Sequence, residues 1–246
     1  MWQIPDRNLT LSNHEVHIWQ SRLDLPTEKI EQLETLLSED EIQRANRFHF
    51  PQHRRRFVIA RGTLRQLLSN YLNLSGDRLR FEYSDRGKPK LAASLNSSNL
   101  QFNLSHSEEL ALYGFTCDRR IGIDLEYLRN IKDVENMARR FFSATEAQQI
   151  LNLSGEAQKK AFLQMWTTKE AYLKATGEGL SGWLESVETT LDRGAISLSS
   201  IRGNSSIAEL WFIDNFIPAS EYIATVAVEK NQVLPKVCFW IANKNY

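Results

Sequence analysis

The stretch that decides the fold is Ile121–Arg129, with the sequence IGIDLEYLR. Its alternation of apolar and other residues predicts a half-buried β-strand. Residues two apart in a strand point to the same face, so Gly122, Asp124 and Glu126 project together. Neighbouring carboxylates repel each other unless a cation or a basic side chain compensates them. The strand alone leaves two interpretations open: a site for a hard divalent ion such as Mg²⁺, or an exposed face of solvated acids.

Composition indicates a globular protein. The chain has 246 residues, of which 42% are hydrophobic and 24% are charged, and its formal net charge is zero. This balance argues against binding nucleic acid through a basic surface. The N-terminal residues show no signal-peptide pattern, and no window approaches the roughly 20 apolar residues of a membrane span. We therefore expect a cytoplasmic protein with reduced thiols at Cys117 and Cys238.

Periodicity predicts an α+β fold in which one order of elements occurs twice. In the first half we expect a strand, helices, and then short strands and a hairpin, in residues 15–25, 26–48, 52–74, 79–91, 100–107 and 110–128. In the second half we expect helices and then strands, in residues 134–153, 155–177, 184–191, 195–200, 208–214 and 222–230. The pattern indicates a pseudo-duplicated chain with halves 1–118 and 119–246, the second including a C-terminal tail, and a cleft shared between them.

The helix predicted at 52–74 has one broad apolar stripe, formed by Phe57, Ala60, Leu64, Leu67, Leu68 and Tyr71. Arginines are frequent in and before this helix: Arg44, Arg47, Arg54, Arg55, Arg56, Arg61 and Arg65. We expect a core helix whose opposite face is basic. A solvated face accounts for at least four of these arginines.

A third carboxylate comes from the helix predicted at 155–177. Trp166, Glu170 and Lys174 are spaced four apart and share one side of it. Taken alone, Glu170 and Lys174 read most simply as a surface ion pair. The alternative is that Glu170 completes a metal site and Lys174 approaches a phosphate, which requires the helix to face the Asp124 strand.

Two further segments offer contacts for an anion. The turn Arg86–Gly87–Lys88 combines basic groups with a glycine that lets the backbone approach a ligand, and Lys90 follows. Asn103, Ser105 and His106 add short polar groups at the end of a strand. The chain contains no nucleophile elbow, phosphate-binding P-loop, dinucleotide fingerprint or paired zinc spacing, which disfavours the usual chemistry of those motifs.

Together, FNLSHS, GKP, GIDLE, RRFFSATE and WTTKEAYLKATGEGL resemble the 4′-phosphopantetheinyl transferases of the large, surfactin-synthetase-activating (Sfp) type. The order and separations match over roughly 38–180. The resemblance implies a duplicated, monomeric enzyme with its active site between the halves. It implies transfer of the phosphopantetheine arm of coenzyme A to a serine of an acyl, peptidyl or polyketide carrier protein, with release of adenosine 3′,5′-bisphosphate. It implies neither a nucleic acid nor a membrane partner.

The resemblance also implies roles for individual residues. Asp124, Glu126 and Glu170 would hold Mg²⁺; Glu170, or a water that it orients, would accept the serine proton, and Lys174 would stabilise the phosphates. The residues implied to contact coenzyme A are Arg44, Arg86, Gly87, Lys88, Asn103, Ser105 and His106. Glu41 departs from the pattern, because some relatives carry a basic residue there.

Two other functions stay open at this point. One is a non-catalytic module that binds anions or RNA through the arginine-rich helix, and the other is a different Mg²⁺-dependent phosphotransferase. Converging acids beside an anion site disfavour the binding module, because without a metal they would repel phosphate.

Overall fold

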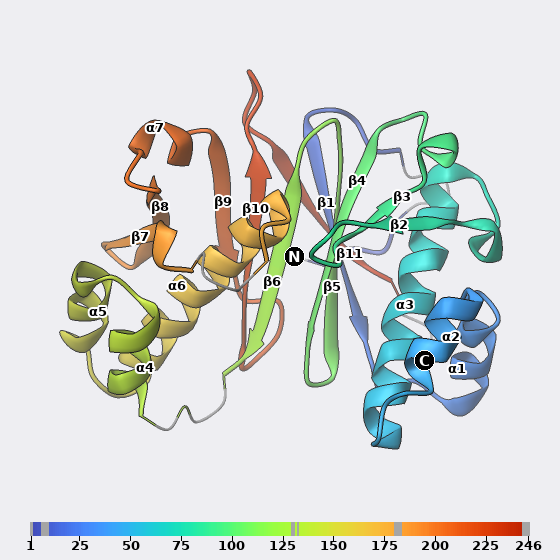
Figure 1. Ribbon diagram of the computed structural model, residues 1–246, viewed down its shortest axis with the longest axis horizontal. Helices are drawn as coiled ribbons and strands as arrows, with labels where there is room; N and C mark the ends of the chain where they lie inside the picture. Colours follow the sequence, from blue (N-terminus) through green and yellow to red (C-terminus); the bar gives the residue numbers. More distant parts are fainter. Residues whose placement is uncertain (1, 6–9, 129–130, 132, 180–183, 243–246) are drawn as a thin grey trace. The chain divides into compact units, whose positions relative to one another are not determined.

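The computed structural model describes residues 2–5, 10–128, 131, 133–179 and 184–242. Its contacts divide the chain into two units (Figure 1). Unit 1 comprises Met1–Ser84, Pro89–Asp118 and Lys236–Tyr246, and unit 2 comprises Asp85–Lys88 and Arg119–Pro235. The expected halves divide at the same point, between Asp118 and Arg119. Two segments lie in the other unit than expected: the C-terminal strand joins unit 1, and the turn Asp85–Lys88 joins unit 2.

Unit 1 packs helices on one mixed sheet. Its sheet has the strand order β11-β1-β5-β4, in which β11 is parallel to β1 and the other pairs are antiparallel. The strands of this sheet are β1 (Glu15–Arg22), β4 (Leu100–Ser107), β5 (Leu110–Cys117) and β11 (Lys236–Ile241). The remaining elements are α1 (Thr27–Glu34), α2 (Glu39–Ala45), α3 (Pro51–Leu72), the short pair β2 (Phe81–Tyr83) and β3 (Pro89–Leu91), and the 3₁₀ turns Gly76–Arg78 and Ala93–Leu95.

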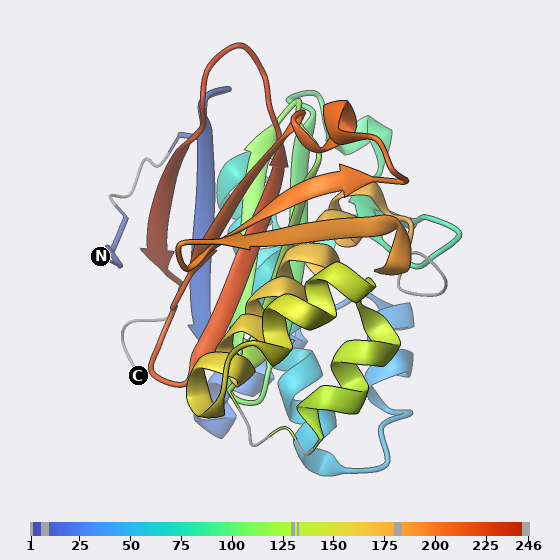
Figure 2. The same ribbon diagram turned by 90° about the vertical axis from the view of Figure 1, so that its left-hand side faces the viewer.

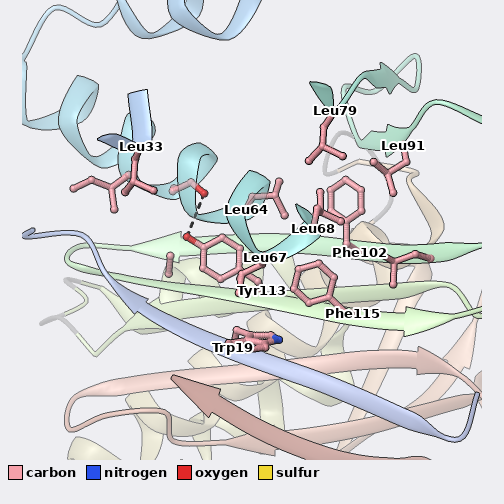
Figure 3. Packing of buried hydrophobic residues seen from close by; sticks show 14 of the residues in the cluster. Trp19, Leu33, Leu64, Leu67, Leu68, Leu79, Leu91, Phe102, Tyr113 and Phe115 are labelled. Atoms are coloured by element: carbon pink, nitrogen blue, oxygen red, sulfur yellow. Dashed lines mark hydrogen bonds between the residues drawn. The ribbon is translucent and has the colours of Figure 1, made fainter. Parts of the chain in front are cut away.

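The core of unit 1 lies between α3 and this sheet. Leucines of α3 pack against aromatic side chains of β4 and β5, and the Tyr113 hydroxyl donates a hydrogen bond of 3.2 Å to the Ala60 carbonyl (Figure 3). This confirms the predicted stripe: Phe57, Ala60, Leu64, Leu67 and Leu68 are buried, and Tyr71 packs against the same core.

The predicted solvated arginine face is wrong. Arg61 and Arg65 are buried, where they contact the Glu41 carboxylate at 2.9 and 2.6 Å. Among the others only Arg44 and Arg47 are exposed, while Arg54, Arg55 and Arg56 are half-buried and bond to acids or a carbonyl of the fold. An arginine on a polar helix face becomes internal when the next layer supplies a carboxylate, and helical periodicity does not report that layer.

Unit 2 has a three-stranded antiparallel sheet of order β6-β10-β9 and a separate pair, β7-β8. Helix α6 packs on the sheet, and α4 and α5 lie beside α6 (Figure 2). The strands are β6 (Ile121–Tyr127), β7 (Val187–Asp192), β8 (Ala195–Ile201), β9 (Trp211–Phe216) and β10 (Tyr222–Glu229). The helices are α4 (Val134–Phe141), α5 (Ala144–Leu151), α6 (Gly155–Thr176), α7 (Ser205–Ala208) and the 3₁₀ turn Leu184–Ser186.

The hairpin expected within 110–128 is wrong. Strand β5 pairs with β1 and β4, whereas β6 pairs with β10, so the two consecutive strands belong to different sheets. Asp118 has a left-handed backbone, with φ of 58°, where the chain passes from one unit to the other. Both strands are apolar enough to accept several partners, so local sequence does not select the pairing.

The two units repeat one helical arrangement. In each, a short helix begins with a capping box, Ser38 with Glu41 in α2 and Ser143 with Glu146 in α5, and a helix of 22 residues follows. The box glutamate is buried and pairs with that long helix: Glu41 with Arg61 and Arg65, Glu146 with Lys169 at 2.7 Å. This repeat, together with the mixed helices and strands, confirms the expected pseudo-duplicated α+β fold.

Helix α6 lies unusually close to strand β6. A Cβ atom at Gly122 would lie 2.0 Å from the Ala171 carbonyl oxygen and 2.4 Å from the Ala175 backbone nitrogen. Gly122 therefore lets the helix backbone contact the strand backbone directly. Within the described residues, no helix is long and apolar enough to cross a membrane.

We predict that Gly122→Ala destabilises the protein by about 3 kcal/mol, because the added methyl overlaps backbone atoms that cannot rotate away. Urea unfolding followed by tryptophan fluorescence measures the loss. The matched control is Gly76→Ala, where the new Cβ would meet its nearest neighbours at 3.4 Å and should change stability by less than about 1 kcal/mol. Equal effects of both substitutions would contradict the close packing.

We also predict that Glu41→Gln costs about 3–5 kcal/mol, because it leaves two buried guanidinium groups without their carboxylate. The control is Glu39→Gln, an exposed acid in the same helix, which should cost less than about 0.5 kcal/mol. The same unfolding assay compares them, and a Glu41 variant as stable as the Glu39 variant would refute the buried pairing.

Candidate active site

The carboxylates predicted to gather do so between β6 and α6. Gly122, Asp124 and Glu126 share the face of β6 that packs against α6, and Glu170 comes from that helix. The side chains of Asp124 and Glu170 are both buried, with 4% of each residue exposed, and Glu126 is half-buried. The alternative of an exposed face of solvated acids on this strand is therefore wrong for Asp124, while Glu126 is half-buried.

Lys174 belongs to the same cluster. Its ammonium group donates a hydrogen bond of 2.5 Å to Asp124 Oδ1, and it lies one turn of α6 beyond Glu170. The simple expectation of a surface pair between Glu170 and Lys174 is wrong, because Glu170 is buried and the ammonium reaches the strand. We refer to Asp124, Glu126, Glu170 and Lys174 as the acid cluster.

Burial between β6 and α6, together with the neighbouring acids, raises the pKa of Glu170 to about 7. Burial is the largest cause, the charge of Asp124 adds to it, Lys174 opposes it, and Glu126 raises it further. The Glu170 carboxyl therefore changes protonation near neutral pH, as a proton acceptor in catalysis must.

The donor set of the acid cluster suits a hard divalent cation. Mg²⁺ prefers carboxylate oxygens, and Asp124, Glu126 and Glu170 present three carboxylates from two rigid elements. Burial is the main cause of the raised pKa of Glu170, and repulsion from Asp124 and Glu126 adds to it. A bound cation would remove that repulsion, so the residues present fit the ion that the sequence predicts.

A threonine network that sequence reasoning missed fixes α6 on the sheet. Thr167 Oγ1 lies 2.8 Å from Thr225 Oγ1 of β10, and the Thr168 hydroxyl donates a hydrogen bond of 3.1 Å to Asn215 Oδ1 of β9. Thr225 also donates to Asn215 and is the register partner of Asp124. The signal was available in the sequence: two adjacent β-branched residues within a helix, directly before Lys169 and Glu170.

The turn Arg86–Gly87–Lys88 also lies in unit 2. Gly87 has a φ of 80°, a backbone conformation that favours glycine. A side chain at this position would meet no neighbouring atom, so the backbone conformation and not a lack of space accounts for the glycine. Lys88 Nζ donates to the Ile121 carbonyl at 3.1 Å and the Ala175 carbonyl at 2.9 Å, and so joins the start of β6 to the end of α6. Burial, with a smaller effect of Arg120, lowers the pKa of Lys88 to about 8.

The remaining predicted contacts lie in unit 1. Arg44 is exposed on α2, with its guanidinium carbon 5.5 Å from the centre of the Phe57 ring. On the edge strand β4, Asn103 and Ser105 are buried on one face and His106 is exposed on the other. Glu41 is the buried partner of Arg61 and Arg65, so its departure from the family pattern has a structural reason.

Two models of known protein families match this chain, each mostly within one of the two units defined by its contacts. Residues 24–114 match the family described as "4′-phosphopantetheinyl transferase, N-terminal", and residues 120–227 match the "4′-phosphopantetheinyl transferase superfamily". These ranges fall on either side of the boundary between Asp118 and Arg119.

Individual relatives carry the same name. The 4′-phosphopantetheinyl transferase HetI of a Nostoc species is 43% identical over 239 residues, which is 97% of this chain and 97% of HetI. The 4′-phosphopantetheinyl transferase psf-1 of Bacillus pumilus is 34% identical over 66% of this chain and 67% of its own. The 4′-phosphopantetheinyl transferase Sfp of Bacillus subtilis is 29% identical over 71% of this chain and 75% of its own. The chain therefore belongs to the 4′-phosphopantetheinyl transferase superfamily and is an enzyme of that class.

Proposed function

We propose that the enzyme transfers the 4′-phosphopantetheine arm of coenzyme A to a serine hydroxyl of an apo carrier protein and releases adenosine 3′,5′-bisphosphate. The observation that carries this proposal is the burial of Asp124 and Glu170 close enough for the charge of one to raise the pKa of the other, with Lys174 bonded to Asp124, in a chain of this family. We further propose that it acts as a cytoplasmic monomer on acyl, peptidyl or polyketide carriers.

Asp124, Glu126 and Glu170 are the residues proposed to hold Mg²⁺. When bound, the ion would supply positive charge to the pyrophosphate of coenzyme A. The protein contributes the fixed placement of the three acids, which comes from the backbone contact at Gly122 and the threonine network on α6. This placement avoids reorganisation of the site when the substrate arrives.

Glu170 is proposed as the group that takes the proton of the carrier serine, directly or through a water that it orients. In the metal-free protein burial and the neighbouring acids raise its pKa to about 7, and a bound cation would favour the carboxylate form that accepts a proton. Lys174 holds Asp124 and presents an ammonium group at the same place, which suits the charge of the pyrophosphate and of the departing bisphosphate.

The proposed contacts to coenzyme A retain the residues that the family resemblance implies. Arg86, Gly87 and Lys88 come from the turn in unit 2, and Arg44, Asn103, Ser105 and His106 come from unit 1. Lys88 Nζ donates to the Ile121 and Ala175 carbonyls, and an ammonium group carries three N–H donors, so these two bonds leave it able to contact a phosphate as well.

The competing binding module receives less support from the structure than the enzyme. Its basic surface depended on the arginines around α3, and Arg61 and Arg65 are internal partners of Glu41. A different Mg²⁺-dependent phosphotransferase would turn over another phosphate donor in place of coenzyme A.

The reaction is tested by incubating the protein with coenzyme A, Mg²⁺ and a panel of apo carrier proteins. We expect each accepted carrier to gain the mass of one phosphopantetheine in intact-protein mass spectrometry. Asp124→Asn and Glu170→Gln should each reduce kcat/KM by about 100-fold or more. Glu156→Gln, an exposed acid on the same helix, is the control and should leave the rate unchanged. No mass gain on any carrier would overturn the proposal.

The raised pKa of Glu170 predicts a pH-dependent stability cost in metal-free protein. A carboxyl whose folded pKa lies above its unfolded value stabilises the fold least at high pH, so the cost grows between pH 4.5 and about 7. Relative to Glu170→Gln, wild type should lose about 2–3 kcal/mol between pH 5 and pH 8 in chelator. Added Mg²⁺ at pH 8 should stabilise wild type more than the variant. Parallel pH profiles of the two proteins would contradict the assignment.

A further inference from the structure

Three chemically different metal-binding side chains, none of them part of the acid cluster, meet in unit 1. Glu15 and His17 lie two apart on β1 and so share a face, and His17 is the register partner of Cys238 on β11. One potential ligand atom from each residue lies within 4.8 Å of the other two. The proposed transferase mechanism uses none of them.

The His17 ring is held with one nitrogen directed at this cluster. His17 is buried, with 1% exposed, and its Nδ1 lies 2.7 Å from the Tyr71 hydroxyl, which also accepts a hydrogen bond of 2.8 Å from Trp19 Nε1. The other ring nitrogen, Nε2, lies 3.8 Å from Glu15 Oε2. Imidazole ligands in metal sites are commonly oriented in this way, by a hydrogen bond at the second nitrogen.

Glu15 and Cys238 are both partly exposed to solvent. Glu15 is 17% exposed; its Oε1 contacts Lys236 at 3.0 Å, and its Oε2 accepts a bond of 2.9 Å from the Ser12 hydroxyl. Cys238 is a half-buried free thiol. A carboxylate oxygen, an imidazole nitrogen and a sulfur together suit Zn²⁺, whereas sulfur and imidazole do not suit Mg²⁺.

We propose that Glu15, His17 and Cys238 form a binding site for Zn²⁺ or a similar thiophilic divalent ion, which ties the C-terminal strand β11 to β1. Ligands of tetrahedral Zn²⁺ lie about 3.3–3.8 Å apart, so shifts of about 1 Å bring these three into place. Cys238 binds as thiolate and gives its proton to solvent. The fourth position is left for water or another small ligand.

A metal ion bound to Glu15, His17 and Cys238 would affect the stability of strand β11. Strand β11 pairs with β1 through Lys236–Ile241, and on its other side Trp240 forms an isolated bridge with Gln3. Its contacts with β1 join segments far apart in the sequence, so β11 can open locally at the cost of this ladder and the short Gln3 bridge. An ion bound to both strands would raise the free energy of that opening by mass action.

Cobalt spectroscopy tests the site in the purified full-length chain. Co²⁺ bound to a thiolate gives a near-ultraviolet charge-transfer band that carboxylate sites do not give, so the acid cluster does not interfere. We expect this band in wild type, its loss in Cys238→Ser, and its retention in Cys117→Ser, which removes the only other thiol. It should also persist in Asp124→Asn, and Zn²⁺ should displace the Co²⁺.

Two further measurements keep the outcome decisive. Tyr71→Phe removes the hydroxyl that orients His17 and should weaken Zn²⁺ binding by about 10–100-fold in chelator competition. Hydrogen exchange in β11 should slow when Zn²⁺ is added to wild type and remain unchanged in Cys238→Ser. Absence of a thiolate band in wild type, or an equal band in folded Cys238→Ser, would overturn the proposal.

Discussion

The direct contact between the backbones of β6 and α6 is the constraint on which unit 2 depends. It requires a glycine at 122, because a Cβ there would overlap the Ala171 carbonyl oxygen and the Ala175 nitrogen. With the helix this close, side chains two residues further along the strand are covered by it, which explains why Asp124 is buried. The same closeness lets Lys174 reach Asp124 from the helix. The site therefore follows from a packing distance set by one residue.

Both units pack a helix of 22 residues on a sheet, but the direct backbone contact at Gly122 belongs to unit 2. In unit 1 the space between the long helix and its sheet is filled by large side chains, among them Leu64, Leu68 and Phe115 (Figure 3). An interface of this kind is a close-packed, largely apolar core. In unit 2 small residues of α6 meet Gly122, and carboxylates flank the contact. Duplication thus supplied two similar scaffolds, of which one is packed for stability and the other carries the acid cluster.

Much of the candidate site could be predicted because its spacing is local. The alternation in β6 places Asp124 with Glu126, and the four-residue interval in α6 places Glu170 with Lys174. What could not be predicted depends on partners far away in the sequence. The pairing of β6 with β10, the return of β11 to β1 and the burial of Arg61 all require knowledge of the neighbouring layer. Local periodicity identifies a face of an element but not what covers it.

Charge balance separates the structural acids from the functional ones. Buried Glu41 meets two guanidinium groups, and buried Glu146 meets Lys169 and two hydrogen-bond donors of Thr189, so each has full compensation. In the acid cluster, Lys174 lowers the pKa of Glu170, against burial and two acids that raise it. Lys169 and Glu170 are adjacent in α6 but differ in their charge environment. Lys169 pairs with the buried Glu146, whereas Glu170 lies among other acids. The structural glutamates are thus neutralised, and the excess of negative charge is confined to the acid cluster, where we propose that a cation binds.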